Sequence, residues 1–257
     1  MIFDACAWAG DYPFGRLRHR TAEDILRLMD AAGIERALVS PLQGAFYRLC
    51  SEANEELSPG IAARADRLSL AAVINPCSPG WQDDLQAAQE TMGAQAVRVI
   101  PSYHAYSLSD PRMGELAEAA AGVGLPVIVT LRLEDERGHP PAFQVPAAPA
   151  AGAARLAGEH PRMKTVISMA RFGEIMALAP EMAGLANLWT DIAGAQGPAM
   201  CVEKLAEAAG AGRLLFGTGL PLQYALPARL KVEVTDLLDK DKAAILAGNA
   251  RGVFAVE

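Results

Sequence analysis

Residues 164–192 read KTVISMARFGEIMALAPEMAGLANLWTDI and contain the pattern that decides the fold. The short apolar run Lys164–Met169 predicts a buried strand, and Phe172–Gly184, rich in Ala, Met and Leu, predicts a helix. A second apolar run, Leu188–Ile192, follows directly. Strands that are apolar on both faces are typical of parallel sheets covered by helices. This stretch therefore predicts one β-α-β unit.

The same alternation runs along the whole chain. The other predicted strands are Ile2–Trp8, Arg36–Ser40, Leu68–Ile74, Ala96–Ile100, Pro126–Leu131 and Arg213–Gly217. The other predicted helices are Thr21–Ala32, Ala45–Arg64, Gly80–Met92, Pro111–Val123, Pro149–His160, Ala199–Ala209, Leu222–Leu238 and Lys240–Val253. Eight such units in 257 residues predict an α/β fold, a single (β/α)8 TIM barrel over residues 1–257. The alternative, a doubly wound sheet, would need a G-x-G-x-x-G turn after the first strand, and residues 6–10 contain none.

Composition excludes several classes of function. The formal net charge of -7 argues against a general nucleic-acid binder. The longest apolar run, around Ala119–Leu131, is too short for a membrane span and is broken by Gly122, Gly124 and Pro126. The four cysteines are scattered without a C-x-x-C pair, and no basic leader precedes the first strand. We therefore expect a cytoplasmic protein without nucleic-acid or membrane partners.

Three arginines are the most informative candidate site residues. The active site of a TIM barrel lies at the carboxyl ends of the strands, where Arg98, Arg132 and Arg171 are predicted. Guanidinium groups bind carboxylates and phosphates with paired hydrogen bonds, so the three predict a pocket for a small anion. The alternative is that the arginines form an internal salt-bridge network with Glu134, Asp135 and Asp191. Asp191 could belong either to this network or to the ligand site.

Two residues are candidates for proton transfer. Asp135 stands beside Glu134 after the fifth strand, and neighbouring carboxyls can raise one pKa. His104 follows the fourth strand and carries a group that titrates near neutrality. The structural alternatives are that Asp135 binds Arg137 or backbone amides, and that His104 packs on Tyr103 or Tyr106.

Several segments of the sequence, taken in order, resemble those of the amidohydrolase-related family of metal-dependent (β/α)8 enzymes. Phe3–Trp8 resembles its opening strand, which normally reads Asp-x-His-x-His. Leu125–Thr130 and Lys164–Met169 resemble its fifth and sixth strands, each normally ending in a ligand His. Arg213–Pro221 resembles its eighth strand, normally Phe-Gly-Ser-Asp-x-Pro, and Ala243–Arg251 its final helix. The resemblance covers nearly the whole chain and implies the barrel of a metal-dependent hydrolase.

The departures from the family pattern concern its chemistry. The family's ligand and base positions correspond to Cys6, Trp8, Thr130, Met169 and Gly219. Of these side chains only Cys6 could bind zinc. The resemblance therefore implies no metal and no cofactor. The loop Glu134–Pro140 is similar to one in a metal-less branch of the same family.

Strand alternation predicts that Asp4, Cys6 and Trp8 face the barrel interior. Trp8 and Met169 would then fill the former metal space or form an apolar floor for a ring-shaped ligand. Two further alternatives remain. One is Cys6 as a nucleophile, and the other is a relocated metal site. The relocated site would use Cys6, His104, His139 and Asp191.

These observations leave two functions of different class. The first is a metal-independent hydrolase or lactonase-like enzyme acting on a small anionic carboxylate, with Asp135 or His104 moving the proton. The second is a non-catalytic barrel that binds a small acid or a protein partner. The family resemblance is also compatible with a homo-oligomer. The predicted substrate-binding residues are Arg98, Arg132, Arg171, Glu134, Asp191, Tyr103 and Trp8.

Overall fold

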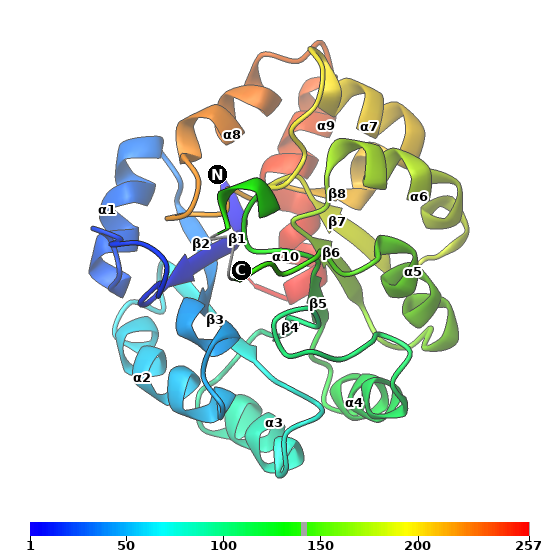
Figure 1. Cartoon of the computed structure of the whole chain (residues 1–257). Helices are drawn as coiled ribbons and strands as arrows, with labels where there is room; N and C mark the ends of the chain where they lie inside the picture. Colours follow the sequence, from blue (N-terminus) through cyan, green and yellow to red (C-terminus); the bar gives the residue numbers. More distant parts are fainter. Residues whose placement is uncertain (140–142, 257) are drawn as a thin grey trace.

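A computed structural model describes residues 1–139 and 143–256. Eight parallel strands pair in chain order around a nearly closed barrel, with most of the helices outside (Figure 1). The strands are β1 (Phe3–Ala9), β2 (Arg36–Pro41), β3 (Leu68–Val73), β4 (Ala96–Val99), β5 (Val127–Thr130), β6 (Thr165–Ser168), β7 (Leu188–Asp191) and β8 (Leu214–Leu215). The segment from β8 returns to β1, because the Ala5 N–H donates to the Phe216 carbonyl at 2.9 Å and the Gly219 N–H to the Cys6 carbonyl at 2.7 Å. The predicted TIM barrel is confirmed.

Helices follow the strands much as predicted. They are α1 (Ala22–Ala32), α2 (Cys50–Ala62), α3 (Trp81–Glu90), α4 (Pro111–Gly122), α5 (Ala150–Glu159), α6 (Phe172–Gly184), α7 (Cys201–Ala209), α8 (Ala225–Glu233), α9 (Asp239–Ala243) and α10 (Asn249–Phe254). The predicted helix from Ala45 starts later, because a 3-10 turn, η1 (Leu42–Ala45), precedes α2. A π-helical turn, Ala244–Gly248, joins α9 to α10. In the described residues, no helix is both long and apolar enough to cross a membrane.

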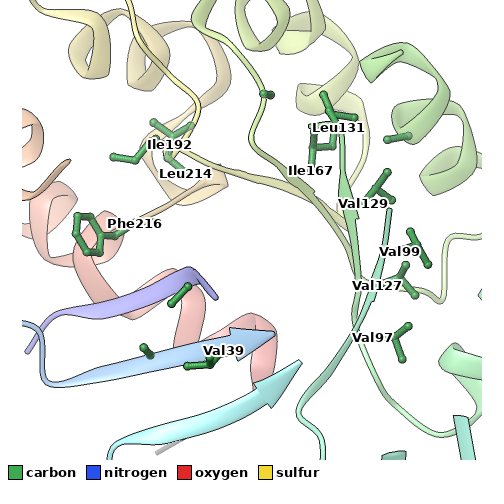
Figure 2. Packing of buried hydrophobic residues seen from close by; sticks show 14 of the residues in the cluster. Val39, Val97, Val99, Val127, Val129, Leu131, Ile167, Ile192, Leu214 and Phe216 are labelled. Atoms are coloured by element: carbon green, nitrogen blue, oxygen red, sulfur yellow. The ribbon is translucent and has the colours of Figure 1, made fainter. Parts of the chain in front are cut away.

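The main hydrophobic core lies between the strands and the surrounding helices. Val97 and Val99 of β4 and Val127 and Val129 of β5 belong to it, and Figure 2 shows them beside one another. Because successive strand side chains point to opposite faces, these alternate residues leave the others to face the barrel interior. The strands therefore bury both faces, as their apolar composition predicts.

A separate apolar cluster fills the amino-terminal part of the interior. It joins Leu38, Ile128 and Leu215 from three strands with Phe3 and Phe254. The Phe3 and Phe254 rings stack with centroids 6.3 Å apart, and Figure 1 shows α10, which carries Phe254, at the centre of the ring of strands. An apolar cluster thus fills this end of the barrel interior.

One prediction about β1 is wrong in part. The pairing register between β1 and β2 shifts between Asp4 and Ala7. Phe3 and Ala5 belong to the amino-terminal interior cluster, whereas Cys6 and Trp8 face the carboxyl-terminal interior. Simple alternation places Asp4 with Cys6 and Trp8, but it does not allow for this irregularity.

Candidate functional site

The Arg98 guanidinium lies inside the barrel at its carboxyl end, with 0% of the residue exposed. Its Nε donates to Ser40 Oγ at 2.8 Å. Its Nη1 donates to Thr130 Oγ1 at 2.8 Å and to Ser168 Oγ at 3.1 Å. The guanidinium carbon also lies 4.5 Å from the centroid of the Trp8 ring. Arg98 is therefore enclosed by hydroxyl groups and an aromatic face rather than open to a ligand.

Asp191 and Cys6 lie beside this buried cation. Asp191 accepts hydrogen bonds from the Met169 and Ala193 N–H groups at 3.2 and 3.0 Å. Burial raises the pKa of Asp191, although these bonds and the charge of Arg98 act in the opposite direction. Burial also raises the pKa of Cys6 to about 12, so its thiol stays protonated at neutral pH. This setting does not favour Cys6 as a nucleophile.

Asp4 is also completely buried, next to the segment after β8. Its Oδ1 accepts from the Cys6 and Thr218 N–H groups at 2.9 and 3.0 Å, and its Oδ2 from the Thr218 hydroxyl at 2.5 Å. Burial outweighs these bonds and raises the pKa of Asp4 to about 7. Asp4 therefore ties β1 to the end of β8 and helps to close the barrel.

Arg132, two residues after β5, makes a different set of contacts. Its Nη1 and Nη2 donate to the two carboxylate oxygens of Glu174 at 2.7 and 2.6 Å. Nη1 also donates to the carbonyl of Met169 at 2.7 Å. Met169 has a left-handed backbone with φ of 62°, an uncommon conformation for a side chain of this size. Arg132 thus holds the turn after β6 in place through a bidentate ion pair.

A cavity of about 330 Å³ opens above these residues, and we call it the mouth cavity. It is lined by Arg132, Glu134, Asp135, Glu136, Arg137, Met169, Arg171, Gly194, Gln196 and Gln223. These residues follow β5, β6, β7 and β8, so the cavity lies at the carboxyl end of the barrel. Its size suits a small organic molecule.

Arg171 is the most exposed of the three predicted arginines, with 46% of its side chain accessible. Its Nη2 donates to Glu136 Oε2 at 2.6 Å and lies 3.6 Å from Asp135. Within the described residues, its Nε and Nη1 have no hydrogen-bond partner. Sequence alternation predicts Arg171 inside the barrel, but it lies at the rim because it directly precedes α6.

Asp135 lines the mouth cavity with its carboxylate paired to Arg137. Arg137 donates from Nε and Nη2 at 2.9 and 2.6 Å and from its backbone N–H at 3.0 Å. These bonds hold the pKa of Asp135 well below its usual range. The carboxylate is therefore ionised at neutral pH and is a weak base. This is the loop-binding arrangement named above as the alternative to catalysis.

His104 does not line the mouth cavity. Its Nε2 lies 3.0 Å from the Gly44 carbonyl and 3.8 Å from Cys50 Sγ, and its ring stacks on Tyr106 with centroids 6.4 Å apart. Burial lowers the pKa of His104. The ring is therefore packed in the loops after β2 and β4, as the structural alternative predicts.

Glu134 and Tyr103 both contact His139. The Tyr12 hydroxyl donates to Glu134 Oε1, and His139 Nε2 lies 3.6 Å from the same oxygen. The Tyr103 hydroxyl lies 3.4 Å from His139 Nε2. These contacts connect the loop after β1 with the loops after β4 and β5. Tyr103 therefore supports the wall of the site without lining the mouth cavity.

Of the three predicted arginines, Arg132 and Arg171 line the mouth cavity, whereas Arg98 does not. Arg98 and Trp8 are buried below the cavity, and Arg132 is paired with Glu174. Among these three arginines, only Arg171 has guanidinium nitrogens without a hydrogen-bond partner in the described residues. Sequence reasoning missed Glu174, whose position three residues after Arg171 is a frequent place for an acid in a helix's first turn. It also missed Gln196 and Gln223, for which the sequence carries no signal.

The predicted relocated metal site is not assembled in the described ranges. No group of three or more His, Cys, Asp or Glu side chains there is placed to hold a metal ion. His104 contacts Gly44, His139 contacts Tyr103, and Cys6 lies 3.4 Å from Ser168 Oγ. Cys6 and Asp191 both contact Ser168 beside Arg98, whereas His104 and His139 lie in other hydrogen-bond groups in the loops.

Comparison with known proteins identifies the family. Residues 4–256 match the family model described as amidohydrolase, so the chain belongs to the amidohydrolase family. A search of curated proteins finds no match.

Solved structures agree in fold. A 2,6-dihydroxybenzoate decarboxylase complexed with 2,6-dihydroxybenzoate has a TM-score of 0.76 and 19% identity, over 99% of this chain and 100% of that one. A 5-carboxyvanillate decarboxylase from Sphingomonas paucimobilis has a TM-score of 0.76 and 14% identity, over 100% and 99%. A dihydroxybenzoic acid decarboxylase from Polaromonas, with bound manganese and 2-nitroresorcinol, has a TM-score of 0.76 and 18% identity, over 99% and 96%. At these identities the similarity establishes the fold.

Proposed function

We propose that this chain is a metal-independent member of the amidohydrolase family that binds a small aromatic carboxylic acid in the mouth cavity. The observation that carries the proposal is Arg171. Its half-exposed guanidinium lines a cavity of about 330 Å³ and has Nε and Nη1 unused within the described residues. A carboxylate can accept two parallel hydrogen bonds from such a group.

The ring of the acid would lie toward Met169 and Gln223, which line the same cavity. The similar decarboxylases are described with dihydroxybenzoate, nitroresorcinol and related ligands, which supports an aromatic acid as the ligand class. Glu136 competes for Arg171, so we expect modest affinity.

The residues at the family's metal-ligand and base positions do not fit a divalent metal ion. The side chains of Trp8 and Gly219 offer no ligand atom, and Cys6 is the one side chain among the five of a type that binds zinc. Thr130 already accepts a hydrogen bond from Arg98, and Gln223 Nε2 lies 3.8 Å from Met169 Sδ. We therefore propose that this chain belongs to the branch without the usual metal ligands. Protein purified without chelator should contain no stoichiometric zinc or manganese, and one full equivalent would contradict this proposal.

Calorimetry with 2,6-dihydroxybenzoate tests ligand binding. Resorcinol, which has the ring without the carboxylate, should bind much more weakly. Arg171→Gln should weaken acid binding about tenfold or more, because a hydrogen bond to a charged group contributes about 1.5–3 kcal/mol. Arg155→Gln is the matched control, since Arg155 lies on α5 in an exposed pair with Glu159. If the acid does not bind at millimolar concentration, or binds equally to Arg171→Gln, the proposal fails.

A metal-independent enzyme acting on the bound acid is the second candidate. It is favoured by one observation, that Asp135 lines the same cavity and lies 3.6 Å from Arg171. The low pKa of Asp135 and the distant contacts of His104 favour the binding protein instead. Asp135→Asn should leave acid binding intact; if wild type converts a bound acid and this variant does not, the enzyme is the correct assignment.

A further inference from the structure

A second, larger hollow lies beside the loop between β1 and α1, and we call it the loop groove. Its volume is about 1000 Å³, compared with about 330 Å³ for the mouth cavity. One side is the β1–α1 loop, including Tyr12, Arg16 and Arg18, and the other carries Phe46 and Tyr47 after η1. A hollow of this size is at the upper end of the range for small-molecule sites.

The loop groove carries positive charge that its own residues do not neutralise. Arg20 Nη1 pairs with Asp11 Oδ1 at 2.5 Å. In the part of the chain that the structure describes, Arg16 and Arg18 make no ion pair or side-chain hydrogen bond. The mouth cavity differs, because each of its arginines has a carboxylate partner. The two unpaired guanidiniums leave the loop groove with a formal excess of two positive charges.

Aromatic rings form the opposite wall of the loop groove. The Phe46 ring meets Tyr12 edge to face at 5.9 Å and Tyr103 at 5.5 Å. Tyr47 lies next to Phe46, and its hydroxyl donates to Glu56 at 3.4 Å. These contacts hold Phe46 in place, and Phe46 and Tyr47 both line the loop groove.

Backbone contacts at Gly10 fix the β1–α1 loop next to Gln43. The Gly10 N–H donates to the Arg20 carbonyl at 2.6 Å, which closes the base of the loop. Gly10 has φ of 123°, and a Cβ there would lie 1.6 Å from Gln43 Oε1. Gln43 is a buried residue that lines the loop groove, and its Oε1 has no hydrogen-bond partner. Gly10 thus adopts a φ that other residues rarely adopt, and its lack of a Cβ leaves room for the Gln43 amide on the floor of the loop groove.

We propose that the loop groove is a second ligand site, independent of the mouth cavity, for a dianionic compound that carries an aromatic ring. Two guanidiniums match the two charges of a phosphate monoester or an aromatic dicarboxylate. The rings of Phe46 and Tyr47 accommodate the ligand's ring. The loop groove, at about 1000 Å³, is large enough for a compound bigger than the single-ring acid proposed for the mouth cavity.

Calorimetry with phenyl phosphate and phthalate tests this site and distinguishes the two anion types. Inorganic phosphate lacks the ring and benzoate lacks the second charge, so both should bind at least about tenfold more weakly at the loop groove. The double variant Arg16→Gln/Arg18→Gln should lose at least about tenfold in affinity for the better dianion. Both side chains are exposed, so we expect the variant to fold normally.

The two proposed sites can be tested independently of each other. Arg171→Gln should leave dianion binding at the loop groove unchanged, and Arg16→Gln/Arg18→Gln should leave 2,6-dihydroxybenzoate binding unchanged. Arg155→Gln is the charge-matched control for Arg171→Gln, and Arg155→Gln/Arg162→Gln, at two exposed arginines, is the control for the double variant. If neither dianion binds at millimolar concentration, or if the double variant binds them as tightly as wild type, the second site is refuted.

Discussion

The barrel interior around Arg98 and the rim around Arg171 use the same side chain in opposite ways. Arg98 is 0% exposed and is surrounded by the hydroxyls of Ser40, Thr130 and Ser168. The Arg171 side chain is 46% exposed, and its partners Glu136 and Asp135 are also partly exposed to solvent. Desolvation makes a buried charge dependent on every partner, whereas water replaces lost partners at the rim. The same residue type therefore supports the fold inside and is available to a ligand outside.

The largest expected effect of this difference is on stability. Arg98→Ala should lower the free energy of unfolding by about 3–5 kcal/mol, because it opens a cavity and leaves three buried hydroxyls without their donor. Urea denaturation followed by circular dichroism measures this loss. A loss below about 1 kcal/mol would mean that the interior tolerates solvent or rearranges around the vacancy.

A pH effect on the interior should come next. The folded-state pKa of Asp4, about 7, lies above its ordinary value of 3.8. The folded protein therefore keeps a proton that the unfolded chain releases, so this group makes stability fall as the pH rises from about 4 to 7. The slope should approach about 1.4 kcal/mol per pH unit at most. Asp4→Asn should flatten this dependence in denaturation series across the window; an unchanged slope would assign it to Asp191 or another group.

The Arg132–Glu174 pair is intermediate, since 5% of the Arg132 side chain and 31% of the Glu174 side chain are exposed. Arg132→Met should cost about 1–3 kcal/mol, because Glu174 loses its bidentate partner while remaining partly hydrated. The double variant Arg132→Met/Glu174→Leu should recover part of this loss. Additive losses in this double-mutant cycle would show that the pair is not coupled.

The smallest effect is expected at the rim itself. Arg171→Ala should change the free energy of unfolding by less than about 1 kcal/mol, because exposed ion pairs contribute little. Thermal and urea denaturation beside Arg98→Ala provide the direct comparison. A loss as large as that of Arg98→Ala would remove the distinction between interior and rim.

Much of the fold could be predicted from local patterns. Each short apolar run became a strand, because strands buried on both faces need only local sequence to be recognised. The irregular register of β1 could not be predicted, since it arises from pairing with β2 and from closure against the segment after β8. The helix predicted from Ala45 was wrong at its start for a related reason, because Gln43 and Gly44 pack against neighbouring strands and loops.

For the candidate site, the sequence by itself determined which residue types stand at the strand ends. These include three arginines, Trp8, Met169 and Gly219. Only the tertiary structure decided what the arginines do, because partners come from other strands. Thr130 meets Arg98 across 32 residues and Glu174 meets Arg132 across 42. Side-chain type follows from the chain alone, but burial and charge pairing depend on long-range contacts that no local pattern encodes.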